Sequence, residues 1–219
     1  SVILAVRDDR DIVMASDGRV LGEDCDVISD RSLKTLALNG GVCLGLAGSS
    51  DMMRVVLSSF GFRCRGTHPI DLLAACQEAA CPVDVDYPDA RDEVTSVLGW
   101  MVRRGPDRYR HTGQAAVILA GESADRPALC RWGYPARALE SAGESGYAEA
   151  VVGSIPESGS RAASRFRRVV HGERTTTHAE ERLSRAVRFC AGHFGDRGPI
   201  GGAIFLRRLS RGFRLVRGE

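Results

Sequence analysis

Two short apolar segments at the start of the chain constrain its fold most strongly. Residues 2–6 and 11–15 are largely apolar, and a charged turn, residues 7–10, joins them. Strands buried on both faces have this composition, because neither face of such a strand meets water. The sequence therefore predicts a buried β-hairpin at the start of the chain.

A second hairpin is predicted for residues 33–38 and 42–47. The turn between them, residues 39–41, reads Asn-Gly-Gly, and these residue types tolerate the positive φ angles of tight hairpin turns. Residues 19–31, between the two hairpins, are polar and are expected to form a loop. The second hairpin leads directly into a helix, for which Ser49 or Ser50 is the expected N-cap.

The remaining segments alternate between groups of helices and groups of strands. Such segregation is typical of an α+β domain with antiparallel sheets, rather than of a parallel βαβ sheet. The length of 219 residues suits one domain, residues 1–219. Helices are expected at residues 69–80, 161–170 and 178–193 (capped by Thr177), strands at 114–120, 128–132, 148–152, 203–207 and 213–216, either type at 94–102, and an irregular excursion at 83–92.

Composition excludes several classes of function. The net charge is only +2, so neither nucleic acid nor an anionic membrane is expected as a main partner. The seven cysteines include no CxxC pair, which favours reduced thiols in a cytoplasmic protein. No apolar run approaches the roughly 20 residues of a membrane span, and no secretory signal is recognised at the start. The five histidines lack metal-ligand spacing, so no metal or cofactor is expected.

Lys34 is the only lysine in the chain, and every other basic residue counted with it is an arginine. Arginine stays charged under all ordinary conditions, whereas a desolvated lysine can lose its proton. A single lysine between apolar Leu33 and Leu36 therefore indicates a site that needs a compact, titratable amine. The alternative is a surface lysine that has remained by chance.

Several motifs, in this order, resemble a proteasome β-type subunit, within the N-terminal nucleophile hydrolases. A Ser leads the first strand where the family usually has Thr. The other motifs are Ser16-Asp17-Gly18-Arg19, Lys34, Leu46-Ala47-Gly48-Ser49-Ser50-Asp51, Val152-Gly153-Ser154, and Asp196 followed by Ile200-Gly201-Gly202. The resemblance spans almost the whole chain. It implies a four-layer αββα sandwich of two antiparallel sheets flanked by helices, assembly into a homo-oligomeric ring, peptide or unfolded-protein substrates, and an ATPase unfoldase as a further partner.

The chemistry of these residues suits an amide hydrolase. A serine hydroxyl needs a base, and the α-amine of Ser1, with an ordinary pKa of about 7.7–8.0, is a suitable one. Lys34 would favour the neutral amine, and Asp17 would hold Lys34 in place. The Gly48 amide would receive the developing oxyanion. Ser154 and Asp196 would position the amine and the hydroxyl, while Val20, Leu46 and Arg54 are candidates for the substrate pocket.

Each of these residues also has a structural explanation. Ser1 would be an unstructured terminus, Asp17 part of an ordinary turn, Gly48 a requirement of close packing, Ser154 a simple cap and Asp196 a loop acid facing water. A chain that starts at Ser implies removal of an initiator Met or propeptide, or trimming.

The sequence also departs from the family pattern. Ile200 occupies the place of a Ser that commonly precedes the glycine pair, with Pro199 before it and one extra residue in the gap. Two alternatives to a proteasome-like peptidase therefore stay open: a catalytically silent, ring-forming scaffold subunit, and a small-molecule amidase or acyltransferase on the same fold.

Overall fold

A computed structural model gives the fold of the chain. It describes residues 1–8, 10–22, 24–39, 41–104, 115–124, 126–133, 136, 139–143, 148–171, 179–210 and 216–217. The predicted cap Thr177, His178 and most of the predicted strand 213–216 lie outside the described residues.

The first hairpin forms the centre of a five-stranded antiparallel sheet. Every residue of its two strands, β1 and β2, is buried, as their apolar composition predicts. The strand order is β10-β1-β2-β11-β12, with bounds β1 (Val2–Arg7), β2 (Asp11–Asp17), β10 (Ala148–Gly153), β11 (Ile204–Ser210) and β12 (Val216–Arg217).

The second hairpin begins a second five-stranded antiparallel sheet. Its strands lie in sequence order, as β5 (Thr35–Asn39), β6 (Val42–Ala47), β7 (Ala116–Ser123), β8 (Arg126–Gly133) and β9 (Glu140–Ser141). A separate two-stranded ribbon connects the hairpins, as β3 (Val20–Leu21) and β4 (Val27–Ser29).

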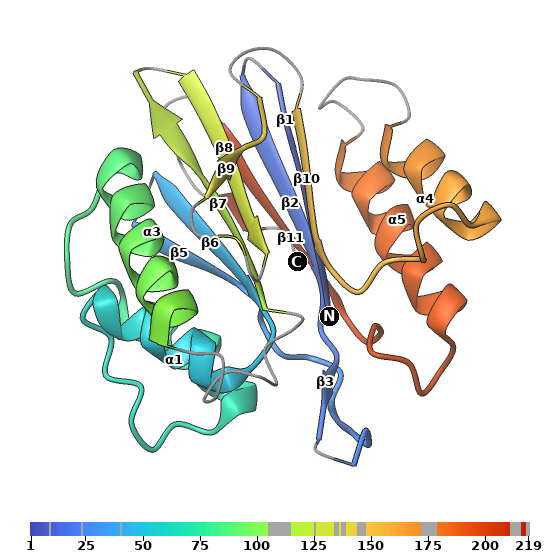
Figure 1. The fold of residues 1–219 in the computed structure, drawn as a ribbon, viewed down its shortest axis with the longest axis horizontal. Helices are drawn as coiled ribbons and strands as arrows, with labels where there is room; N and C mark the ends of the chain where they lie inside the picture. Colours follow the sequence, from blue (N-terminus) through green and yellow to red (C-terminus); the bar gives the residue numbers. More distant parts are fainter. Residues whose placement is uncertain are drawn as a thin grey trace.

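The two sheets face each other, and helices cover their outer faces (Figure 1). An apolar cluster that includes Ile3, Met14 and Ile118 fills the space between the sheets. A second cluster lies between the β5–β9 sheet and α1 (Ser50–Ser59), α2 (Leu72–Ala79) and α3 (Tyr87–Arg104). The short 3₁₀ helix η1 (Pro69–Asp71) precedes α2 and has no buried residue. A third lies between the β1-containing sheet and α4 (Arg161–His171) and α5 (Ala179–Phe194).

The α+β class with antiparallel sheets is confirmed, and Ser49 caps α1 by accepting a hydrogen bond from the Met52 amide. Three local predictions were wrong. Residues 19–31 contain the β3–β4 ribbon, and the short β9 was not expected. The excursion expected at 83–92 ends at Tyr87, where α3 begins, because Pro88 is tolerated in the first turn of a helix. Residues 94–102 belong to the same helix.

Candidate active site

Ser1 directly precedes β1. Because side chains alternate along a strand, Ser1 lies on the same face as Ile3, which belongs to the cluster between the two sheets. Its α-amine donates a hydrogen bond to the Pro199 carbonyl at 2.7 Å. Its carbonyl accepts one from the Ser154 amide at 2.7 Å. The next amide, of Val2, donates to Asp17 Oδ1 at 2.8 Å. The first residue of the chain is therefore an ordered part of the fold.

The Lys34 ammonium lies against the Ser1 hydroxyl. Lys34 Nζ is 2.6 Å from Ser1 Oγ and 3.2 Å from Asp17 Oδ1, and it also donates to the Arg19 carbonyl. These three acceptors match the three N–H donors of an ammonium group. Lys34 is only 2% exposed and Asp17 is fully buried, so the pair acts on Ser1 with little screening by water.

Asp17 is the centre of the hydrogen-bond network around Ser1. Besides Lys34 and the Val2 amide, its carboxylate accepts from the Arg19 amide at 3.1 Å and the Gly201 amide at 3.3 Å. A buried carboxylate needs such donors to offset the loss of hydration. Asp17 therefore fixes the ends of β1 and β2 and the loop before β11 around one charged group.

Burial and, second, the nearby Lys34 charge lower the pKa of the Ser1 α-amine from 8.0 to about 6, against the opposing effect of Asp17. Burial also lowers the pKa of Lys34, and Asp17 again opposes this shift. A neutral α-amine has a free lone pair and can accept a proton. At neutral pH the site therefore combines a largely unprotonated α-amine with a hydroxyl group that Lys34 contacts.

A second network, centred on Arg19, holds the loop that carries Pro199. The guanidinium contacts both carboxylate oxygens of Asp30, at 2.7 and 3.3 Å. It also donates to the carbonyls of Gly198, at 3.3 Å, and Asp196. A Cβ at Gly201 would lie 2.4 Å from Arg19 Cζ, so a side chain there would force the guanidinium to move away from its present partners.

Sequence reasoning missed Asp30 and Pro199. Asp30 is one of several acids in a polar stretch, and nothing in its local sequence marks it as the partner of Arg19. Pro199 acts through its backbone carbonyl, which every residue possesses.

Gly48 lies just beyond Ala47, the last paired residue of β6. Its φ angle is +120°, and a Cβ there would lie 2.6 Å from Ala115 Cα, so both backbone conformation and packing favour glycine. Gly48 is exposed. It is linked to the site through Leu46, two residues earlier, whose amide donates to the Lys34 carbonyl at 2.9 Å.

Ser154 and Asp196 contact the site through backbone atoms. The Ser154 amide binds the Ser1 carbonyl, and the Asp196 carbonyl binds Arg19. The sequence had predicted hydrogen bonds that position the amine and hydroxyl, and the Asp196 side chain is instead exposed to water. Ile200, in the place of the usual family Ser, is fully buried in the cluster beneath α5.

A cavity of about 720 Å³ adjoins the residues that anchor Ser1. Pro199 and Ser154 line it, together with Trp132 and Phe194. Of the predicted pocket residues, Leu46 is buried in the core toward the helices, and the Arg54 guanidinium is bound to the carbonyls of Cys64 and Thr67. Val20 is half-buried in β3. None of these three lines this cavity.

Among the described residues, no cluster of His, Cys, Asp or Glu has the arrangement of a metal site, and no helix is long and apolar enough to cross a membrane. All seven cysteines are free thiols.

No protein-family model matches the chain, and no curated protein matches it. The geometry around Ser1 therefore has to carry any functional conclusion.

Proposed function

We propose that this chain is a proteasome-like peptidase of the N-terminal nucleophile hydrolases, with Ser1 as nucleophile and its own α-amine as general base. One observation carries the proposal: Lys34 Nζ lies 2.6 Å from Ser1 Oγ and is paired with buried Asp17. The two facing sheets with helices outside support the finer fold assignment, a four-layer αββα sandwich of this superfamily.

The first chemical step is acylation of Ser1. Ser1 Oγ attacks the carbonyl carbon of a peptide bond, and its proton passes to the neutral α-amine. Lys34 stabilises negative charge on the attacking oxygen. The exposed Gly48 amide, beyond the end of the β6 ladder, is proposed as the donor to the oxyanion.

The tetrahedral intermediate collapses when the C–N bond of the substrate breaks. The protonated α-amine gives its proton to the leaving amine, which departs as the new N-terminus. Water then attacks the acyl ester and gives a proton to the α-amine. The bond between the acyl carbon and Ser1 Oγ breaks, the α-amine returns the proton to Oγ, and the new carboxyl group departs with the product. In this scheme Ser154 and Asp196 are positioning residues, because Ser154 holds Ser1 by its amide and Asp196 holds Arg19 by its carbonyl.

The assembly and its partners are part of the same proposal. A ring-like homo-oligomer, peptide or unfolded-protein substrates and an ATPase unfoldase follow from the resemblance in sequence. A cytoplasmic location is proposed from the seven free thiols, since disulfides are rare in reducing compartments.

Intact-mass analysis with an electrophile that acylates N-terminal hydroxyl nucleophiles, such as a β-lactone, tests the chemistry. We expect one adduct on Ser1 in the native protein and none in Ser1→Ala, because the label needs both the hydroxyl and its base. The untreated mass must also show a free α-amine, since the mechanism requires one. A folded protein with a free Ser1 that takes up no label would contradict the proposal.

Two observations favour the alternative of a silent scaffold subunit: Asp196 is exposed, and Ile200 replaces a family Ser with an apolar side chain. A scaffold would assemble into the same oligomer without taking up label. Uptake of label therefore distinguishes the two functions, and light scattering on the same samples checks that a protein without label is assembled. A small-molecule amidase or acyltransferase would take up the label but leave unfolded proteins and peptides intact.

A further inference from the structure

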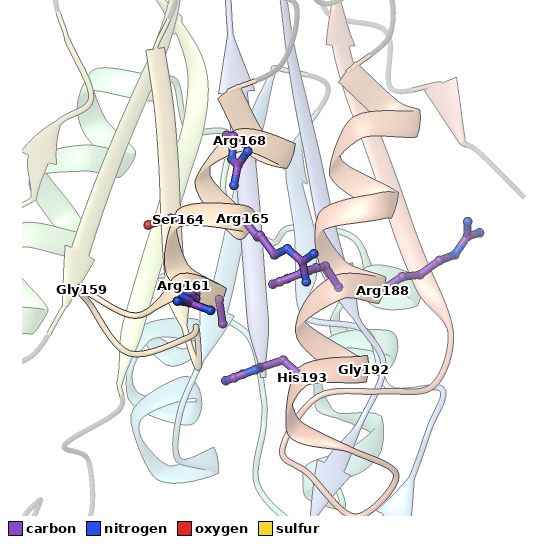
Figure 2. A pocket seen from close by; sticks show the side chains of 10 residues that line it. Gly159, Arg161, Ser164, Arg165, Arg168, Arg188, Gly192 and His193 are labelled. Atoms are coloured by element: carbon purple, nitrogen blue, oxygen red, sulfur yellow. The ribbon is translucent and has the colours of Figure 1, made fainter.

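A basic groove lies between α4 and α5, and it is lined by none of the residues that hydrogen-bond to Ser1. It has a volume of about 740 Å³. Figure 2 shows the side chains of Arg165 and His193 directed into the space between the two helices, and Arg188 extending away from it. The residues that line the groove are Gly159, Arg161, Ala162, Ser164, Arg165, Arg168, Arg188, Phe189, Gly192 and His193.

The four groove arginines, Arg161, Arg165, Arg168 and Arg188, differ from the arginines of the chain that pair with an acid. Arg19, Arg185 and Arg208 form ion pairs with Asp30, Glu181 and Asp11. Within the described part of the chain, the four groove arginines form no ion pair or hydrogen bond with a carboxylate. The clustering of these four positive charges is what indicates a binding site. The choice of arginine over lysine indicates nothing, because the chain has only one lysine.

The sequence of α4 explains the excess of positive charge. The helix contains no acidic residue, so it offers no internal i, i+4 partner to its arginines. Arg161, Arg165 and Arg168 follow each other at intervals of four and three residues and so lie along one face. Seven residues of α-helix span about 10 Å along the axis. The groove therefore presents a row of guanidinium groups rather than a single one.

We infer that this groove binds an oligophosphate, either as a free chain or as the phosphate tail of a nucleotide. Guanidinium groups bind phosphate oxygens through paired hydrogen bonds. A row of them over about 10 Å matches an anion whose charge is spread along a chain better than one compact phosphate. Phe189, half-buried on the wall of the groove, provides an apolar surface beside this row. The inference is independent of any chemistry at Ser1.

Isothermal titration of the full chain with tripolyphosphate tests the inference. We expect binding that weakens as salt is raised, since interactions of exposed charges are screened. Arg165→Gln/Arg168→Gln should weaken it by about tenfold or more, equivalent to about 1.4 kcal/mol. Arg167→Gln/Arg185→Gln is the matched control, because it removes the same charge from exposed positions on the same helices that do not line the groove. The control should retain affinity within about twofold.

Titrations with other anions show whether the groove prefers a nucleotide or a free phosphate chain, and whether it distinguishes these from other anions. ATP that binds more tightly than tripolyphosphate would identify a nucleotide site, and equal affinities would identify a site for free chains; both support the inference. Equal losses in the two double variants, absence of binding at low salt, or equal affinity for orthophosphate would overturn it. An oligoglutamate peptide that competes as strongly as tripolyphosphate would also overturn it, because the groove would then be an acidic-peptide site.

Discussion

The pH dependence of Ser1 acylation is the most direct measure of the environment around the α-amine. The structure lowers the pKa of this amine from 8.0 to about 6. An amine with a pKa of about 6 is about 90% neutral at pH 7, whereas one with a pKa of about 8 is only about 10% neutral. If the α-amine is the base, the labelling rate should rise with pH to a midpoint near 6 and be nearly constant above pH 7.

The size of the shift follows from burial and charge. Two pKa units correspond to about 2.7 kcal/mol of differential interaction between the protonated and neutral amine. Burial is the larger cause and the Lys34 charge the second. Lys34→Met retains an unbranched apolar side chain but removes the charge, so it should move the midpoint upward, part of the way from about 6 toward 8. It should also slow labelling, because Lys34 no longer stabilises the attacking oxygen.

The assay is the initial rate of adduct formation on Ser1, followed by intact mass between about pH 5 and 9, a range that spans both the ordinary and the lowered amine pKa. Arg185→Gln serves as a charge-matched control, because Arg185 lies on the exposed side of α5, paired with Glu181, and should leave the midpoint unchanged. A native midpoint near 8 would show that the amine is as hydrated as in a peptide. A Lys34→Met midpoint equal to or below the native one would refute the coupling between the two amines.

Three further predictions concern stability. The free energy of unfolding should rise by up to about 2.7 kcal/mol between pH 6 and 8, because over this range the Ser1 α-amine binds a proton in the unfolded protein but not in the folded one. Chemical denaturation across this range measures the change, and a free energy of unfolding that does not rise would contradict the lowered pKa. Arg19→Gln should cost about 1–2 kcal/mol, since it removes hydrogen bonds to the carbonyls of Asp196 and Gly198 together with an ion pair whose Asp30 partner is 45% exposed. It should also slow labelling of Ser1 through the loop that carries Pro199; thermal unfolding and labelling check the two effects. Gly201→Ala should cost about 1–3 kcal/mol because its methyl group overlaps Arg19, whereas Gly192→Ala, in open space on α5, should be neutral or slightly stabilising; equal midpoints of thermal unfolding for the two variants would contradict the packing argument.

The sequence was most informative where chemistry and local pattern coincide. The β1–β2 hairpin, the β5–β6 hairpin and the Ser49 cap of α1 were all predicted, because burial on both faces, a glycine-rich turn and a capping hydroxyl are local signals. The local signals failed at α3. An acidic, proline-containing stretch favours a loop, but Pro88 lies in the first turn, where its missing N–H costs nothing.

The network around Ser1 was only partly predictable. Lys34 and Asp17 stand out by residue type and motif, and the structure brings both to Ser1. Asp30 and Pro199 do not stand out, because one is an ordinary loop acid and the other acts through its backbone. Backbone donors and acceptors are the same at every position in a sequence, and only the folded chain selects which of them face the site.

The sequence by itself determined the α+β architecture and the residue types present around Ser1. The apolar pattern of each segment and the presence of a single lysine do not depend on which residues meet in the folded chain. Only the tertiary structure decided their distances, their burial and hence the lowered pKa of the α-amine near 6. It also decided which arginines are paired and which gather in a groove. Desolvation and Coulomb interactions depend on distances through space, and these join residues as far apart in the chain as Ser1 and Pro199.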